Sequence, residues 1–382
     1  MRRGRHEGGI TKRLDRNNKV IGYQVQVRLP GGQRKTLGTV PTMREARLLA
    51  QQGQVDLASG RLSENKRQKL DEYLRAWIAS KKPGLAPSTH DSYDLNRRRL
   101  EPYCGSVRLD VLRPKDIQQA YAGLTAQGLK PKSVRQAHRL LHAALQDAVR
   151  LGLVPMNVVD STSPPRDQLN EMKTLTAPQL IILFRESRDD PLHALWVVLA
   201  TTGLRLGEAL GLRWGDIDLD AGRLSVQRAL QRQSGGAGLV FTTPKTAQSR
   251  RTVDLTTVAI KALKGHRVRW EDRRDKLGDK WQGSDVVFVS DVGKLLDPTG
   301  MAERLGRILA RAQLPRIRVH DLRHTAATLA LQQGVSPKVV QEMLGHSSIT
   351  LTLGTYSHVL PPMRREAADR MNALFDEPDP EP

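Results

Sequence analysis

Cysteine is almost absent from this chain of 382 residues, in which Cys104 is the single example. One thiol cannot form a disulfide within the chain, and it cannot supply the cysteine cluster of a structural zinc site. We therefore expect Cys104 to be a small, partly buried residue. A chain of this length can form two or three domains, each able to bury a core of its own.

Long apolar segments are also missing. No run of apolar residues is long enough to cross a bilayer, and the sequence has neither a signal-peptide pattern nor a lipidation motif. It has no P-loop and no clustered carboxylates of the kind that a two-metal site needs. We therefore expect no membrane partner, no metal and no other cofactor.

Acidic residues are fewer than basic residues in this chain. The chain has 61 Lys and Arg against 40 Asp and Glu, which gives a formal net charge of +21 and a pI of about 10.5. This balance predicts a polyanionic partner, and nucleic acid is the leading candidate because neutralising phosphates releases counterions. A membrane surface would also accept the charge. A cytoplasmic location, associated with a bacterial nucleoid, fits these properties.

Positive charge is dense in residues 1–65, with 13 Lys and Arg against 5 Asp and Glu, a net of +8. Alternation over 20–29 predicts a strand, and 33–39 predict a second strand after a Pro-Gly-Gly turn. A helix is expected over 42–59. We expect a small α+β module that lays its strands in a DNA groove. A solvated basic module without specific contacts is the alternative.

Residues 66–155 have the pattern of an all-α bundle. Helices are expected over 71–80 and 88–99, from Pro114 onward, and over 131–150. We expect the arginines at 97–99 to be exposed, and a bundle of short helices with exposed arginines is a good clamp for a duplex. Residues 156–174 break the periodicity and predict a linker.

Residues 175–375 predict a larger, mainly α domain with a short antiparallel sheet. Three strands of one hairpin sheet are expected at 223–226, 238–243 and 251–255. Helices are expected at 192–202, 205–212, 299–313, 320–333, 336–344 and 361–375. The last residues, 376–382, are acidic and proline-rich, and we expect them to be disordered.

Four fragments of this domain hold groups suited to a phosphodiester. They are residues 202–208 (TGLRLGE), 243–246 (TPKT), 318–325 (RVHDLRHT) and 345–358 (GHSSITLTLGTYSH). The last fragment contains Tyr356, the only tyrosine after Tyr121. A phenol ten residues after the histidine of a Gly-His pair is a candidate nucleophile, although a half-buried packing residue is the usual role of a tyrosine.

Each fragment is weak evidence when taken alone. A second H-x-x-R pattern at 266–269 lacks the flanking residues, and we interpret it as a solvated helix face. His320 and Arg323 are three residues apart near a helix start, so they should face the same way. In this order and position, the four fragments together resemble the tyrosine recombinase, or phage integrase, family.

The resemblance covers essentially the whole chain. It implies an arm-type DNA-binding module at 1–65, a core-binding domain at 66–155 and a catalytic domain at 175–375. The first of these matches by pattern and charge alone, as in integrases of temperate phages and integrative elements. In many relatives the tyrosine is the ninth residue after the histidine, whereas in phage-type members it is commonly the tenth, as it is here.

The resemblance also implies roles for the matched residues. Tyr356 would attack the scissile phosphate and form a 3′-phosphotyrosyl link. Arg205, Arg323 and His346 would hold the non-bridging oxygens, where charge develops in the transition state. His320 would help to accept the phenolic proton, since a tyrosine with a pKa of about 10 is almost wholly neutral at pH 7.

Two further residues complete the implied set. Lys245 would protonate the departing 5′-oxygen, and Glu208 would orient the arginines. These cationic and histidine side chains would supply the electrostatics that other nucleases take from divalent metal. Because a phosphotyrosyl bond keeps the energy of the broken link, no ATP is required.

The expected activity is site-specific recombination that integrates or excises a phage or mobile element. The implied partners are double-stranded DNA at attachment sites, three further copies of the chain in a homotetramer, and DNA-bending and excision proteins. Alternatives are a chromosome-dimer resolvase, a tyrosine topoisomerase and a non-catalytic DNA-binding regulator. Occupation of every matched position argues against the regulator.

Overall fold

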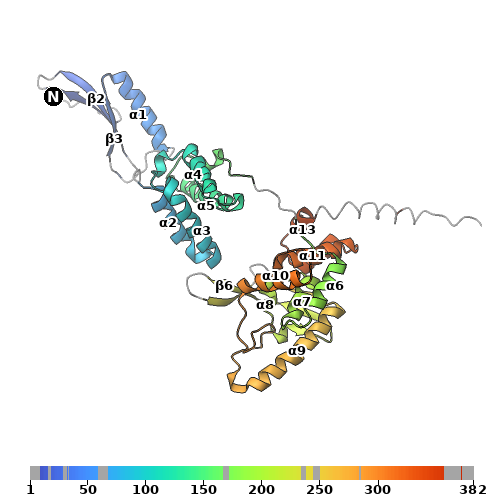
Figure 1. Cartoon of the computed structure of the whole chain (residues 1–382). Coiled ribbons are helices and arrows are strands. Elements are labelled where there is room, and N and C mark those ends of the chain that lie inside the picture. The colour runs from blue at the N-terminus through green and yellow to red at the C-terminus, as the bar shows by residue number, and fades with distance from the viewer. Residues whose placement is uncertain are drawn as a thin grey trace, which may run out of the picture. The chain divides into compact units, whose positions relative to one another are not determined.

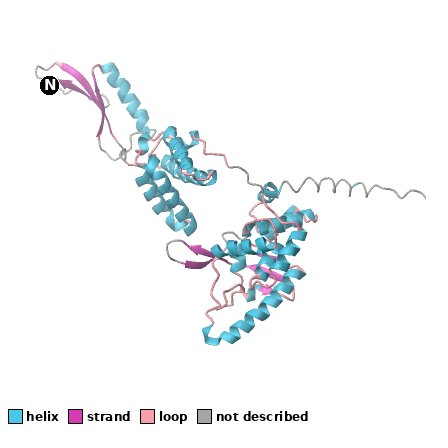
Figure 2. Cartoon of the chain, in the orientation of Figure 1, coloured by secondary structure: helices cyan, strands magenta, loops and turns pink. Residues whose placement is uncertain are grey.

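The computed structural model describes residues 9–15, 19–28, 32, 34–58, 68–166, 172–233, 238–243, 250–283, 285–356 and 371. The chain divides into two compact units, Met1–Leu169 and Asn170–Pro382. Figure 1 labels the elements of each unit, and Figure 2 colours them by type. The chain is mainly helical with small antiparallel sheets, which confirms the expected fold class.

The first unit begins with a three-stranded antiparallel sheet. Its strands β1 (Ile10–Leu14), β2 (Val20–Arg28) and β3 (Arg34–Val40) lie in the order β1-β2-β3, and helix α1 (Met43–Ala58) packs on them. Thr42 and Glu45 cap this helix reciprocally, with both backbone-to-side-chain distances at 3.3 Å. Strand β1 is an addition to the sequence prediction, because its T-K-R stretch carries no apolar alternation.

The helical part of this unit contains α2 (Leu70–Lys81), α3 (Pro87–Leu100), α4 (Pro114–Ala126) and α5 (Pro131–Arg150). Short helical turns lie between them at Lys82–Gly84, Glu101–Gly105 and Leu109–Val111, and a further turn, Val158–Ser161, follows α5. The helices enclose an apolar core that includes Tyr73, Leu74, Trp77 and Ile78. Cys104 lies in this core and is fully buried, and burial raises the pKa of its thiol to about 12.

One expectation about this bundle was wrong. Arg97 is buried rather than exposed, because its guanidinium binds the carboxylates of Asp71, Asp94 and Glu101. A buried arginine needs such partners to offset its loss of hydration. Its neighbour Arg98 is exposed, so the side chains of this basic run divide between the core and the surface.

The second unit is built around α7 (His193–Thr202), whose side chains are almost all buried. Around it lie α6 (Ala177–Glu186), α8 (Leu206–Leu210), α9 (Thr257–Leu277), α10 (Met301–Arg311), α11 (Val319–Gln332), α12 (Pro337–Leu344) and α13 (Ile349–Tyr356), with short turns at Trp214–Asp216, Gly278–Lys280 and Pro298–Gly300. Pro337 follows the cap residue Ser336 at the start of α12, as expected. The expected helix at 361–375 lies outside the described residues, apart from Met371.

The strands of this unit form two sheets, which corrects the expectation of one. Strands β4 (Ile217–Asp218), β5 (Arg223–Val226) and β8 (Arg251–Asp254) form the first in the order β4-β5-β8. Strands β6 (Ala229–Gln233) and β7 (Gly238–Thr242) form a separate hairpin. The three predicted strands correspond to β5, β7 and β8, whereas β4 and β6 were not predicted. The pairing of the strands depends on partners that local sequence does not specify.

Helix α9 changes the interpretation of the second H-x-x-R pattern. His266 is not solvated: it is buried, its Nε2 lies 2.9 Å from the carbonyl oxygen of Val287, and burial lowers its pKa to about 4. Val268, two residues later, is exposed. Among the described residues, no helix is both long and apolar enough to cross a membrane.

Candidate active site

Glu208 lies at the centre of the polar network in the second unit. It occupies the third position of α8, and Arg205, the residue before this helix, donates to it from its backbone nitrogen at 2.9 Å and from Nη1 at 2.6 Å. Burial by itself would raise the pKa of Glu208, but the hydrogen bonds and charges of Arg251 and Arg205 outweigh it and lower the pKa. Glu208 is therefore an anion that orients two arginines.

Arg251, at the start of β8, joins this network to another part of the chain. Its Nη2 donates to Glu208 Oε2 at 2.9 Å, and its Nε donates to the carbonyl oxygen of Met343 at 2.7 Å. Met343 is in the last turn of α12, two residues before Gly345. Arg251 was missed in the sequence interpretation, since an arginine that begins a strand has no local mark of burial.

Arg323 lies on α11 and is only 2% exposed. Its Nη1 donates to the carbonyl oxygen of Gly203 at 2.7 Å, and its Nη2 donates to that of Leu344 at 2.8 Å. Gly203 ends α7 at a φ of 65°, and a side chain there would meet Leu344. Burial lowers the pKa of Arg323 to about 9, with Arg205 and Arg251 adding to the effect.

His346 follows α12 and is half-buried. Its Nδ1 lies 2.9 Å from Oγ1 of Thr352 on α13, and its carbonyl oxygen accepts a hydrogen bond from Gln341 at 3.0 Å. Burial lowers the pKa of His346 to about 4, and the charges of Arg323 and Arg205 act in the same direction. At neutral pH, the imidazole is uncharged and can donate through whichever nitrogen carries its proton.

Tyr356 ends α13 and is only 1% exposed, more deeply buried than the half-buried packing residue that was the alternative to a nucleophile. Its hydroxyl lies 2.9 Å from Nδ1 of His324. Burial raises the pKa of Tyr356 to about 12, although the charge of Arg323 opposes this effect. The sequence interpretation missed His324; its position directly after Arg323 in the H-x-x-R-H run was the available signal.

His320 lies in the first turn of α11 and is exposed, whereas Arg323 on the same helix points into the unit. Its ring is edge-on to the ring of His324, with centroids 4.9 Å apart. Partial burial lowers the pKa of His320, and so do the neighbouring His324 and Arg323. Lys245 lies outside the described residues.

The structure thus brings together five of the six expected catalytic positions with Glu208. Electrostatic interactions connect Arg205, Arg323 and His346, and Tyr356 interacts with Arg323. Within the described ranges, no group of three or more His, Cys, Asp or Glu residues is arranged to hold a metal ion.

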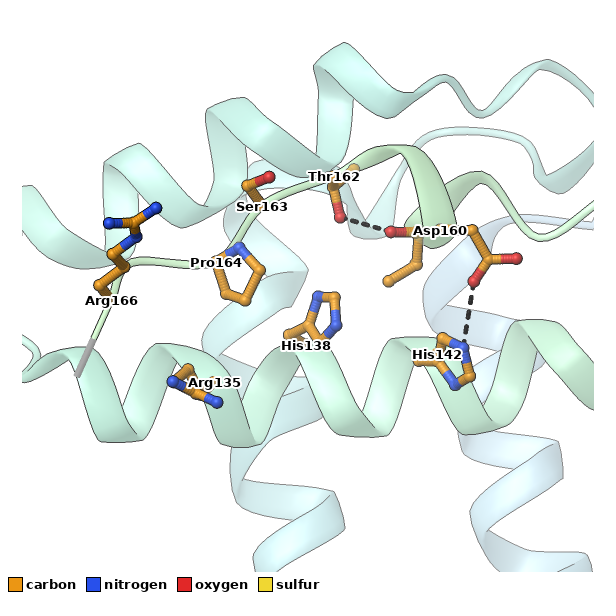
Figure 3. Close-up of a pocket in the computed structure, with 9 residues that line it drawn as sticks. Arg135, His138, His142, Asp160, Thr162, Ser163, Pro164 and Arg166 are labelled. Atoms are coloured by element: carbon orange, nitrogen blue, oxygen red, sulfur yellow. Dashed lines mark hydrogen bonds and ion pairs between the residues drawn. The ribbon is translucent and has the colours of Figure 1, made fainter.

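A second polar site lies in the first unit. A groove of about 500 Å³ runs between α5 and the segment that follows Val158–Ser161. Figure 3 shows Arg135 and Arg166 at one end of it, and His142 paired with Asp160 at the other. Both arginines are exposed, and the distance from His142 Nε2 to Asp160 Oδ1 is 3.1 Å. Exposed guanidinium groups beside a groove are suited to phosphate.

Two family descriptions match the chain. Residues 172–362 match "Phage integrase family", and residues 69–125 match "Phage integrase, N-terminal SAM-like domain". Together they cover the candidate active site and the first half of the helical bundle.

Similar sequences include an integrase of Mycobacterium phage L5, 30% identical over 73% of this chain and 72% of its own length. A "Tyrosine recombinase XerC-like" protein of Caldanaerobacter subterraneus is 29% identical over 80% of this chain and 83% of its own. The ICEBs1 integrase of Bacillus subtilis is 24% identical over 92% of this chain and 97% of its own. The last match extends into the N-terminal module.

Similar folds include the Tn1549 transposon integrase in complex with transposon right end DNA. That structure has a TM-score of 0.70 and 23% identity, over 80% of this chain and 99% of that one. A lambda integrase dimer bound to a core site has a TM-score of 0.56 and 19% identity, over 93% of this chain and 96% of that one.

Proposed function

The chain belongs to the phage integrase family, and from this premise we propose how its residues cut and rejoin DNA. It is a site-specific tyrosine recombinase of the phage or mobile-element type. We assign residues 1–65 to arm-site binding, 66–155 to core-site binding and 175–375 to catalysis, with 156–174 as linker and 376–382 as tail. Recombination takes place in the cytoplasm at the nucleoid, where the chromosome lies.

The observation that carries this proposal is the buried charge of Arg323. In the part of the chain that the structure describes, no carboxylate forms an ion pair with it, and two carbonyl oxygens are its hydrogen-bond partners. Arg205, Arg251 and His346 lie around it, and among the described residues Glu208 is the carboxylate that pairs with Arg205 and Arg251. Such an excess of buried positive charge is stabilised by a bound anion, and a phosphodiester supplies one.

The reaction proceeds in two matched steps. Tyr356 Oη attacks the scissile phosphorus, and the bond from phosphorus to the 5′-oxygen breaks. The phenolic proton passes to a histidine, and the resemblance to the family assigns this role to His320. Lys245 gives a proton to the departing 5′-oxygen. In the second step, the 5′-hydroxyl of another strand attacks the phosphotyrosine and releases Tyr356. Arg205, Arg323 and His346 stabilise the charge on the non-bridging oxygens in both steps.

The partner is double-stranded DNA at attachment sites, bound by four copies of the chain. Among the similar structures is a lambda integrase tetramer bound to a Holliday junction, with a TM-score of 0.55 and 20% identity. Exchange between two duplexes needs four cleavages, which four protomers supply. DNA-bending and excision proteins complete the assembly.

Replacing the nucleophile tests the proposal directly. Wild-type protein incubated with a nicked suicide substrate should form a covalent protein–DNA adduct, because the cut fragment diffuses away before rejoining. Tyr356→Phe should bind the same DNA and form no adduct. Denaturing gel electrophoresis measures both; an adduct of wild-type yield from the Phe variant would refute the assignment.

A further inference from the structure

His324 contacts the nucleophile directly. It lies on α11, immediately after Arg323, while Tyr356 lies at the end of α13, 32 residues later in the chain. The distance from His324 Nδ1 to the Tyr356 hydroxyl is 2.9 Å, and the two ring centroids are 5.8 Å apart. Among the described residues, this is the hydrogen bond that the structure gives to the phenol.

The protonation states of the two side chains limit the forms that this hydrogen bond can take. Burial lowers the pKa of His324, with the nearby Asp321 acting against it and Arg323 and Arg318 adding to it. Burial also raises the pKa of Tyr356 to about 12. Both side chains are therefore neutral at pH 7, and a neutral imidazole offers one nitrogen as an acceptor. When the imidazole proton of His324 is on Nε2, the phenol donates to Nδ1; when the proton is on Nδ1, His324 donates to the phenol oxygen instead.

His320 occupies a different place in this arrangement. It is one helical turn before His324, and its ring meets the edge of the His324 ring rather than that of Tyr356. The resemblance to the family gave His320 the role of accepting the phenolic proton. In the structure, His324 contacts the phenol, and His320 contacts the ring of His324.

We propose that His324 is the positioning residue of Tyr356: it accepts the hydrogen bond of the phenol and fixes its oxygen within the site until a scissile phosphate arrives. This inference rests on the proposed function, because it assumes that Tyr356 is the nucleophile. Loss of one neutral hydrogen bond that orients a reacting atom corresponds to about a tenfold change in rate. This role depends on the acceptor nitrogen Nδ1 and not on the shape of the imidazole ring.

Three substitutions in the full-length chain separate the nitrogen from the shape of the ring. His324→Phe keeps a ring without an acceptor, His324→Asn places an amide oxygen near the position of Nδ1, and His324→Gln places its amide farther out. With a nicked suicide substrate under single-turnover conditions, we expect the Phe and Gln variants to cleave about tenfold more slowly than wild type. His324→Asn should recover most of the rate.

A second reaction measures strand joining in a form that does not use the tyrosine. DNA that carries a 3′-p-nitrophenyl phosphate can be joined to a 5′-hydroxyl strand, with p-nitrophenolate leaving in place of Tyr356. In a Tyr356→Phe background, adding His324→Phe should leave this joining rate unchanged, because no phenol is left to position. Unchanged joining also shows that the variant is folded and binds the phosphate normally.

The outcomes separate this inference from the function on which it rests. An adduct formed by Tyr356→Phe would refute the function itself. If Tyr356→Phe is inactive while His324→Phe cleaves at the wild-type rate, the function stands and the inference fails. Equal losses in cleavage and in joining would also overturn it, because His324 would then support the fold or the phosphate site rather than the tyrosine.

Discussion

Lys245 can be tested by the chemistry that its proposed role predicts. A general acid acts only as the 5′-oxygen departs, so Lys245→Ala should bind DNA almost normally but cleave about 10²–10⁴-fold more slowly. A substrate with sulfur in place of the bridging 5′-oxygen has a leaving group that hardly needs a proton. Lys245→Ala should therefore regain most of its cleavage rate on this substrate, measured in single-turnover assays.

The arginines provide the matched controls for this experiment. Arg205→Ala and Arg323→Ala should not be rescued by sulfur, because these residues act on the non-bridging oxygens. Rescue of all three variants, or of none, would show that Lys245 is not the acid.

Side chains with a chemical signature could be predicted from the sequence, whereas those defined by tertiary contacts could not. Arg205, Arg323 and His346 stood out because the short fragments that contain them occur together in the order and positions of the family that they resemble. Arg251 and His324 act through partners far away in the chain, at Met343 and Tyr356. A sequence interpreted without a fold offers no means of pairing such residues, even though His324 directly follows Arg323.

At the scale of elements, several helices with clear starts were predicted, but α6 and α9 were not, although Thr176 and Thr256 cap them. Pro114, Pro131 and the Ser336-Pro337 pair start helices as expected. Helix α13 was not predicted, because its sequence alternates β-branched residues with leucine and contains a glycine. This helix forms through burial of Thr352 and Tyr356, which no local propensity indicates.

Gly345 shows how one element boundary controls the site. It ends α12 at a φ of 66°, and an added Cβ would lie 2.8 Å from Nη1 of Arg251. We expect Gly345→Ala to cost about 1–2 kcal/mol in stability from its left-handed backbone, seen as a lower melting temperature. It should also slow cleavage, since Arg251 must move and it holds both Glu208 and Met343.

Gly152 offers a control with the same backbone cost. Its φ is 67°, and no heavy atom lies within 4 Å of an added Cβ. Gly152→Ala should lose similar stability while it cleaves at the wild-type rate. If both variants cleave normally, the contact between Gly345 and Arg251 has no part in holding the site.

At the scale of the whole molecule, we propose that the chain joins two DNA-binding parts, the N-terminal module and the helical bundle. The strand β1 exposes Lys12 and Arg13 in the N-terminal module, and Arg135 and Arg166 flank the groove beside α5. Two weak binding sites in one chain raise each other's local concentration, so their joint affinity can exceed either alone by about 10²–10⁴-fold. The gain depends on both DNA sites lying on one substrate.

Deleting residues 1–65 should therefore separate chemistry from assembly. Cleavage of a core-site oligonucleotide should stay near the wild-type rate, because Arg205, Arg323 and Tyr356 all lie in the second unit. Recombination between full attachment sites, measured as product on a gel, should fall steeply. A full-length Lys12→Ala/Arg13→Ala variant should recombine full attachment sites less well than wild type and better than the truncated chain. Its DNA affinity should also depend less on salt, because the slope of log affinity against log salt falls by about 1 for each phosphate that it no longer neutralises. Equal recombination by the truncated chain would mean that this basic module adds charge but no binding that assembly uses.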